Sequence, residues 1–186
     1  MRTSPAPSAG SGMEDLRAVA SALALAPAAG EPDPLLYAVD VLAQRLLGHR
    51  LFTVLRYDVA AGLAHRLYSS APEIYPASGS KRIATAPALQ RMVETGQPLL
   101  TPDAAAVRRN FPDAEAIFAL GCASVLNLPV IVRGRLLGQV NLLHQAGHYT
   151  ASAVEDGMVL TALAAPALLM ESSPIPADGA QGRRNK

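Results

Sequence analysis

The sequence predicts one mixed α/β (α+β) domain, because two apolar strand pairs stand among amphipathic helices with clear end signals. The chain of 186 residues fits a single domain with modest tails, since single domains usually run to roughly 100–200 residues. Hydrophobic residues make up 50% of the chain but aromatic residues only 4%, so we expect a core of Ala, Leu and Val. The predicted domain covers residues 33–171. It follows a flexible segment (1–32) with a short helix around 14–26, and it precedes a disordered tail (172–186).

Capping residues mark the ends of the predicted helices. The carboxylate of Asp33 can accept hydrogen bonds from free amides, Pro34 suits a first helical turn, and Gly48 is placed to end the helix. Near the end of the chain, Ser152 and Glu155 have the spacing of a capping box. Helices are therefore predicted from Asp33 to Gly48, over 87–95, 104–110 and 113–120, and from Ser152 to about 171.

Two hairpins supply the predicted strands. Leu51–Asp58 and Leu63–Ser69 are strand-like and are separated by a short turn. Cys122–Val132 and Arg135–Gln145 form a second pair, joined by a turn that contains a glycine. Between the hairpins, the Pro-, Ser- and Gly-rich stretch 70–80 is predicted to be a loop of the kind that covers pockets.

Charge and cysteine content argue against several classes of protein. Lys and Arg (16) nearly balance Asp and Glu (15), so the chain has no strong field for nucleic acid or an anionic membrane. Cys122 is the only cysteine, which leaves no intramolecular disulfide and favours a reducing, cytoplasmic compartment. The apolar run 158–170 contains Pro166 and is shorter than the roughly 20 residues of a membrane helix, so it is interpreted as a buried helix. We therefore expect no nucleic-acid partner and no membrane partner.

The strands of the second hairpin resemble those of a known family. The segments SVLNLPV (124–130) and GRLLGQVNL (134–142) look like the paired central strands of the GAF domain family, and the order of elements over about 33–170 is also similar. The resemblance implies a GAF-like central antiparallel sheet of five to six strands flanked by helices. It also implies a pocket for a small-molecule ligand between the sheet and the short helices.

The same resemblance implies a role in signal transduction. A cytoplasmic sensor of this kind is expected to form a homodimer through its terminal helices. We expect no output domain in this chain, so a signal would pass to a partner protein or through rearrangement of the dimer.

Three specialised branches of the family do not match this sequence. The Asn-Lys pair of the cyclic-nucleotide motif occurs only at 185–186, and Cys122 is followed by Ala123 rather than by the His typical of bilin attachment. A single cysteine also lacks the resolving partner that the free methionine sulfoxide reductase branch needs. We therefore predict no bound cofactor and no catalytic residues of these kinds.

Polar residues in apolar surroundings are the candidate ligand contacts. Asn127 and Asn141 each lie in an otherwise apolar strand, where a buried amide needs a hydrogen-bond partner or a ligand. Tyrosines beside the 70–80 loop offer an apolar wall with a hydroxyl group, and basic residues near it could meet an acidic ligand. The predicted ligand-binding residues are Tyr68, Ser70, Tyr75, Lys81, Cys122, Ser124, Asn127 and Asn141, with Arg66 and Asp113 as further candidates. Ser124 and Asp113 are included only through their family-like positions.

Other interpretations of these residues stay open at this point. The asparagines can bond across strands, Tyr75 can simply anchor its loop, and Cys122 can be a small buried residue. One rival function is a small-molecule enzyme on the same scaffold that uses Cys122, His144 or His148, and another is a purely structural dimerisation module. His144 and His148 have the spacing of metal ligands on a helix, but Gly147 argues against a helix there, so no metal site is predicted.

Overall fold

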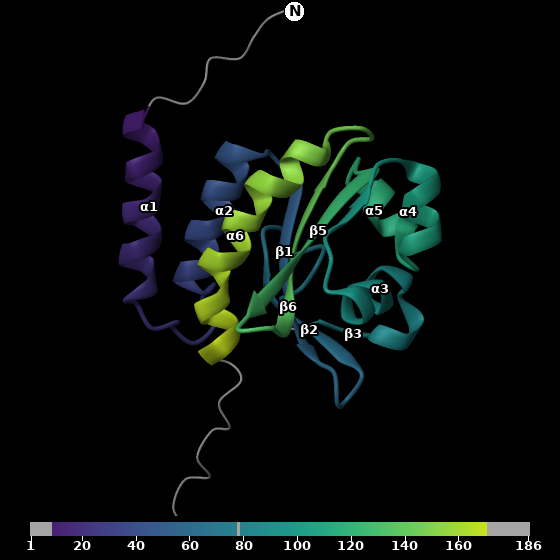
Figure 1. The fold of residues 1–186 in the computed structure, drawn as a ribbon, viewed down its shortest axis with the longest axis horizontal. Coiled ribbons are helices and arrows are strands. Elements are labelled where there is room, and N and C mark those ends of the chain that lie inside the picture. The colour runs from purple at the N-terminus through teal and green to yellow at the C-terminus, as the bar shows by residue number, and fades with distance from the viewer. Residues whose placement is uncertain (1–8, 78, 171–186) are drawn as a thin grey trace, which may run out of the picture.

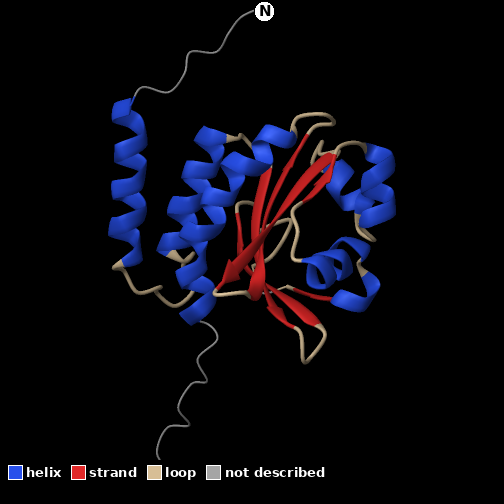
Figure 2. Cartoon of the chain, in the orientation of Figure 1, coloured by secondary structure: helices blue, strands red, loops and turns tan. Residues whose placement is uncertain are grey.

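The computed structural model describes residues 9–77 and 79–170. Its elements, in chain order, are α1 (Ala9–Leu23), α2 (Pro34–Leu46), β1 (Leu51–Asp58), β2 (Leu63–Ser69), β3 (Ser80–Arg82), a 3₁₀ turn (Ile83–Thr85), α3 (Pro87–Thr95), β4 (Leu99–Thr101), α4 (Ala104–Asn110), α5 (Ala114–Ala119), β5 (Ser124–Val132), β6 (Arg135–His144) and α6 (Ala151–Met170). Figures 1 and 2 show one sheet between two layers of helices. Helices α2 and α6 cover one face of the sheet, with α1 outside them, and α3, α4 and α5 lie on the other side.

The sheet has six antiparallel strands in the order β3-β2-β1-β6-β5-β4. The two predicted hairpins form its centre, because β1 pairs with both β2 and β6, and β6 pairs with β5. In the turn between β5 and β6, Arg133 has a φ of 49° and Gly134 a φ of 77°, as a tight two-residue hairpin turn requires. The predicted GAF-like fold class, with an antiparallel sheet of five to six strands, is confirmed.

A continuous apolar core lies between the sheet and helices α2 and α6. Fully buried side chains from α2, β1, β5, β6 and α6 meet there, among them Val39, Phe52, Leu126, Leu142 and Leu160. Full burial of one such side chain stabilises the fold by about 1.5–3 kcal/mol. The Asp33 carboxylate caps α2 by accepting from the backbone N–H of Leu36 at 3.0 Å, as the sequence predicts. The layer of α2 and α6 therefore packs against one face of the sheet and leaves the opposite face to the short helices.

One face of helix α6 is buried in the core, whereas Met158, Val159, Leu169 and Met170 stay exposed to solvent. Within residues 9–77 and 79–170 it is the one helix long and apolar enough to span a membrane by length and composition. Leu160, Ala164 and Leu168 of this helix are wholly buried in the core with the sheet and α2. Core helices of globular domains pass the same length and composition test, so the interpretation of 158–170 as a buried helix agrees with the structure.

Three helix ends differ from the predicted ones. Helix α1 begins at Ala9, inside the stretch predicted to be flexible, and it ends at Leu23 rather than near residue 26. Burial of Val19 against α2 provides a fixed helical turn, and extension from an existing turn adds one hydrogen bond per residue. Helix α6 begins at Ala151, so Ser152 lies in its first turn instead of capping it. Residues 1–8 and the predicted tail over 172–186 lie outside the described residues.

A bulge between β1 and β2 changes which side chains face the helices. Val54 pairs with Tyr68, but the next residue, Leu55, pairs with Arg66, so Leu67 is the extra residue of a β-bulge. Val54 and Tyr68 belong to the core under α2 and α6, whereas Leu55 and Arg66 face the other side. The bulge therefore separates Arg66 from Tyr68, which simple alternation along a strand would place on one face.

Gly138 gives a test of the close contact between β1 and β6. A Cβ atom at this position would lie 1.9 Å from the backbone oxygen of Leu55 and 2.8 Å from Cδ2 of Leu168. We predict that Gly138→Ala lowers the free energy of unfolding by about 3 kcal/mol, the upper end of the usual cost of overpacking, measured by urea denaturation. Gly12→Ala is the control, because a Cβ there meets nothing within 4 Å. An unchanged unfolding midpoint for Gly138→Ala would contradict this strand pairing.

Candidate ligand-binding site

A pocket lies on the face of the sheet opposite α2 and α6, beneath the short helices. Its cavity volume, the space open to the centre of a water-sized sphere, is about 50 Å³. Most of its wall is apolar and consists of Leu51, Leu55, Ala86, Ala88, Leu89, Phe111, Pro112, Ile117, Val125 and Leu143. Its polar lining consists of Thr53, Arg66, Tyr75, Lys81, Asp113, Asn127, Gln139 and Asn141. A mostly apolar hollow with a few converging polar groups is the usual form of a small-molecule site.

Side-chain amides from the central strands form the floor of the pocket. The Tyr57 hydroxyl donates to Oε1 of Gln139, and Nε2 of Gln139 donates to Oδ1 of Asn141. Nδ2 of Asn127 donates to the same oxygen at 2.6 Å, and Nδ2 of Asn141 donates to Oγ1 of Thr53 at 3.0 Å. Each donor orients the next amide, so the network decides which amide atoms face the pocket.

Asn127 leaves one polar atom unpaired at this floor. The residue is 1% exposed, and within the described part of the chain its Oδ1 has no hydrogen-bond partner. Its Nδ2 is committed to Asn141, so the carbonyl oxygen is the atom available to a bound molecule. An unpaired buried acceptor costs about 1–3 kcal/mol, and a donor group on a ligand would recover that cost.

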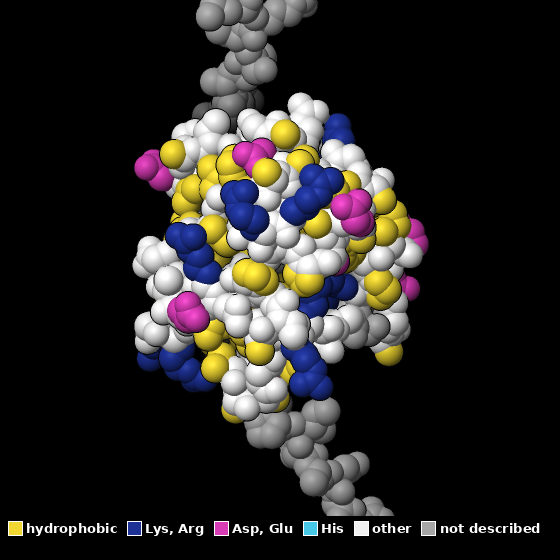
Figure 3. Space-filling view, turned by 90° about the vertical axis from the view of Figure 1, so that its right-hand side faces the viewer, with side chains coloured by type: hydrophobic (Ala, Val, Ile, Leu, Met, Phe, Trp, Pro, Cys, Tyr) yellow, Lys and Arg dark blue, Asp and Glu magenta, His cyan; other side chains and the backbone are white. Residues whose placement is uncertain are grey.

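Charged and phenolic side chains meet at the mouth of the pocket. Nζ of Lys81, on β3, lies 2.6 Å from Oδ2 of Asp113, just before α5, and the Tyr75 hydroxyl donates to the same oxygen at 3.3 Å. The guanidinium of Arg66 lies 5.1 Å from the centre of the Tyr75 ring and donates to the carbonyl oxygen of Pro76. These contacts join the loop after β2 and strand β3 to the segment before α5. Figure 3 views this side of the molecule, where Lys and Arg side chains are spread over the surface.

Burial and neighbouring charge set the protonation of the mouth. Burial acts to raise the pKa of Asp113, but the charge and hydrogen bond of Lys81, together with a backbone hydrogen bond and that of Tyr75, outweigh it and hold this pKa below its usual value. Burial lowers the pKa of Arg66, an effect that Tyr75 and Asp113 oppose, and the guanidinium stays charged at neutral pH. Burial and the nearby Asp113 raise the pKa of Tyr75, so its hydroxyl stays a neutral donor. At neutral pH the mouth therefore carries two positive charges and one negative charge.

Several predicted site residues come together in this pocket. They are Tyr75, Lys81, Asn127 and Asn141, together with the further candidates Arg66 and Asp113. Sequence reasoning missed Gln139 and Thr53. Gln139 lies two residues before Asn141 on the same strand face, and that alternation of polar residues is the signal that would have found it. Thr53 gave no comparable signal, because Thr is common in strands.

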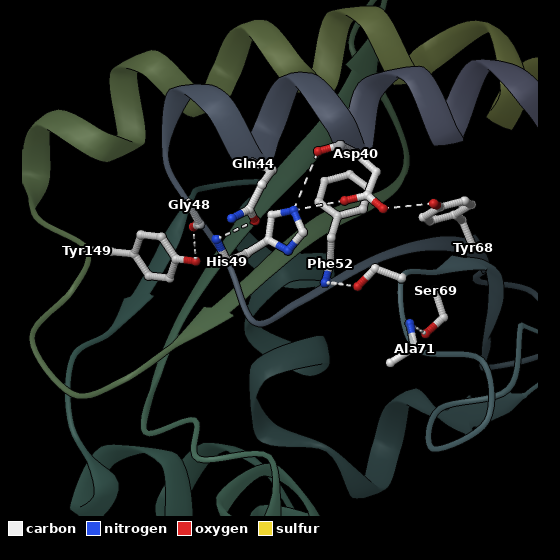
Figure 4. Close-up of polar contacts among 10 residues, drawn as sticks. Asp40, Gln44, Gly48, His49, Phe52, Tyr68, Ser69, Ala71 and Tyr149 are labelled. Atoms are coloured by element: carbon white, nitrogen blue, oxygen red, sulfur yellow. Dashed lines mark hydrogen bonds and ion pairs between the residues drawn. The ribbon is translucent and has the colours of Figure 1, made fainter.

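Tyr68 and Ser70 lie outside the pocket, which corrects their predicted placement. Because of the bulge, Tyr68 faces α2, where its hydroxyl donates to Oδ2 of Asp40 at 2.8 Å. The same carboxylate lies 2.8 Å from Nε2 of His49, as Figure 4 shows. Oγ of Ser70 accepts from the backbone N–H of Phe52 at 2.9 Å. Tyr68 therefore fastens the sheet to α2, and Ser70 extends the contact between β1 and the end of β2.

Cys122 and Ser124 are also placed away from the pocket lining. Cys122 is 1% exposed and packs with Ile117 and Val125. Burial raises the pKa of its thiol, although the charge of Arg50 opposes this, so the thiol is protonated and weakly nucleophilic. Ser124 is wholly buried, and alternation from the pocket-facing Val125 turns its side chain toward α6. The position of Ser124 in the family pattern did not reveal on which face of the sheet its side chain lies.

The rings of His144 and His148 stack on one another, with centres 3.6 Å apart and planes at 12°. Nδ1 of His144 accepts from the backbone N–H of Gln145, and Nε2 of His148 lies 2.8 Å from the carbonyl oxygen of Leu47. Burial and the charge of His148 lower the pKa of His144. Among residues 9–77 and 79–170, no three His, Cys, Asp or Glu side chains are placed to hold a metal ion. The rival enzyme hypothesis therefore relies on side chains that do not line the pocket.

Comparison with known proteins places the chain in a family. The sequence model of the GAF domain matches residues 29–168, and the chain belongs to the GAF domain family. GAF domains are in general small-molecule-binding sensor modules. No curated protein sequence matches the chain.

Solved structures of low sequence identity share the fold. The chain is similar to the GAF domains of two phosphoenolpyruvate-protein phosphotransferases, from Acinetobacter (14% identity, 91% of this chain and 99% of that chain, TM-score 0.65) and Coxiella burnetii (18%, 90% and 100%, 0.63). It is also similar to the chromophore-binding domain of a bacteriophytochrome from R. palustris (11%, 90% and 63%, 0.62). Identities this low show the fold alone.

The contact between Lys81 and Asp113 predicts a dependence of stability on pH. The pKa of Asp113 is lowered in the folded state, so the unfolded chain takes up this proton first, and the stabilisation is lost as pH falls. The difference in unfolding free energy between the wild type and Asp113→Asn should therefore be constant from about pH 7 to 5 and shrink only below about pH 4. Urea denaturation across this range measures it, with the exposed Glu115→Gln as control. A difference already lost at about pH 5 would contradict the ion pair.

Proposed function

We propose that this chain is a sensor module that binds a small molecule in the pocket beneath α3, α4 and α5. The observation that carries the proposal is the unpaired Oδ1 of Asn127 at the floor of a mostly apolar hollow. A buried polar atom without a partner destabilises the empty protein, and a ligand that donates to it removes that cost. Membership in the GAF family supports the same function.

The mouth of the pocket supports a change of state on binding. Lys81 and Tyr75 both contact Asp113 at the mouth, so a ligand that engages any of the three competes with these contacts. Free and bound states then differ in how the loop after β2 is held against the segment before α5. A ligand shifts the balance between two such states by its difference in affinity for them.

A thermal-shift screen against cellular metabolites tests the binding function. A true ligand at about 100 times its Kd stabilises the protein by about 2.7 kcal/mol, which raises the melting temperature by several degrees. Asn127→Ala and Tyr75→Ala should each reduce this shift, because they remove a floor contact and a wall of the mouth. Val59→Ala, in the exposed turn after β1 and outside the pocket, is the control and should keep it.

Two results of the screen would count against the binding function. One is a broad metabolite library without a single stabilising compound. The other is a set of hits whose shifts are the same in Asn127→Ala and Tyr75→Ala as in the wild type. The second result would mean that compounds bind elsewhere on the protein.

We further propose that the module acts in the cytoplasm as a homodimer through its terminal helices, and that it passes its signal to a partner protein. Helix α1 and the turn after it expose Leu16, Leu23 and Leu25, with 46%, 51% and 61% of each residue accessible to solvent. Leu25 also lines a shallow apolar groove between the two helices, together with the exposed Tyr37 and Val41 of α2. A second copy packed on α1 would bury these exposed apolar side chains.

Light scattering of the purified chain at micromolar concentration tests the homodimer. The wild type should have the mass of two chains, and the double variant Leu16→Glu with Leu23→Glu should have the mass of one, because it places charges in the apolar contact. Val59→Glu is the control, since Val59 is also exposed but lies in the turn after β1. A monomeric wild type would remove the dimer from the account.

A further inference from the structure

Free hydrogen-bonding atoms lie at two opposite ends of the pocket. At the floor, Oδ1 of Asn127 is a buried acceptor. At the mouth, Nε of Arg66 is a buried donor without a partner among the described residues, and Nζ of Lys81 uses one of its three donors on Asp113. The floor therefore selects a donor group on a ligand, whereas Arg66 and Lys81 at the mouth select an acceptor group.

The charges at the mouth favour a ligand with a single negative charge. Arg66 and Lys81 are positive and Asp113 is negative, so the lining has one positive charge in excess. Oδ1 of Asp113 has no hydrogen-bond partner in the part of the chain that the structure describes, and its negative charge would oppose a second acid group. A monoanion balances this mouth, whereas a dianion or a neutral molecule does not.

Strand geometry sets the distance between the two ends. Asn127 lies on β5 and Arg66 on β2, and β6 and β1 lie between these strands. Three steps between neighbouring strands, at about 4.8 Å each, separate the two backbones by about 14 Å. The flexible Arg66 side chain covers part of this span. Leu55, which pairs with Arg66 across β1 and β2, packs with Ala86 and Leu89, and these three side chains form an aliphatic wall beside the space between the two ends. A ligand that reaches both ends is therefore elongated and apolar in its middle.

From these observations we infer that the pocket takes an elongated monocarboxylate with an apolar ring body and an N–H donor at the far end. The acid group lies against Arg66 and Lys81, the body lies on the aliphatic wall, and the N–H donates to Oδ1 of Asn127. This inference rests on the proposed binding function and narrows it to one class of ligand.

A series of indole acids tests both ends of the ligand separately on the full chain by isothermal titration calorimetry. Indole-3-propionate carries both groups and should bind. Its 1-methyl derivative lacks the N–H and its methyl ester lacks the charge, and each should bind at least about tenfold more weakly, the effect of losing one hydrogen bond to a buried group. A derivative with a second carboxylate on the propionate side chain, beside the first, should also bind more weakly, because the charge of Asp113 at the mouth opposes it.

Protein variants give a matched second test. Arg66→Gln should weaken indole-3-propionate about tenfold and leave the binding of its methyl ester unchanged. Arg82→Gln is the control, since Arg82 is a neighbouring exposed arginine on β3 that does not line the pocket. Asp113→Asn should increase the affinity of the dicarboxylate relative to the monocarboxylate. The ligand series needs no variant to fold, so it can reject the inference on its own.

The outcomes separate this inference from the proposed function. If the 1-methyl derivative binds as tightly as its parent, the donor end is wrong, and if the ester does so, the acid end is wrong. If no member of the series binds, the ligand class is wrong as a whole. The binding function itself fails only when the metabolite screen also finds no stabilising compound.

Discussion

The constraint on which the site depends is a run of buried side-chain amides across the middle of the sheet. Gln139 and Asn127 both donate to Oδ1 of Asn141. Tyr57 donates to Gln139 at one end of the run, and Asn141 in its middle donates to Thr53. Because these groups satisfy one another, polar atoms can stand in an apolar layer at little cost. The one atom left over is fixed by the central strands rather than by a mobile loop, so the ligand surface exists before a ligand binds.

The bulge between β1 and β2 gives strand β2 contacts on both sides of the sheet. Arg66 faces the pocket, and two residues later Tyr68 donates to Asp40 of α2. Helix α2 is joined in turn to α1 by the ion pair between Arg45 and Asp15. Strand β2 therefore contacts the mouth of the pocket through Arg66 and helix α2 through Tyr68. In this fold, a movement of Arg66 acts on the same strand that anchors the helix layer.

Much of the fold could be predicted because its signals are local. Alternation marked both hairpins, Asp33 marked the start of α2, and the burial cost of an amide in a strand singled out Asn127 and Asn141. Tyr68 could not be placed, because a bulge depends on the pairing of two strands and leaves no mark in either one alone. The contact of Lys81 with Asp113 joins residues 32 apart, and only the folded loops bring them together.

The helix layer shows the same division between local and distant information. The sequence indicated that 158–170 forms a buried helix because this apolar run is short. The whole of α6 is long and apolar enough to span a membrane, so the burial of Leu160, Ala164 and Leu168 in the core is what supports the interpretation. His144 and His148 stack because the chain turns between them at Gly147. Their spacing alone would have suggested a metal site on a helix, and Gly147 is the residue that argued against it. The sequence can thus suggest which polar residues matter, but the pairing register of the strands decides which of them face the pocket.

The most direct test of the account is a crystal structure of freshly purified protein, with electron density inspected above the central strands. The account predicts a bound molecule in the hollow with a donor atom about 3 Å from Oδ1 of Asn127. Density showing protein side chains filling the hollow, with Oδ1 of Asn127 bonded to a protein group, would contradict it.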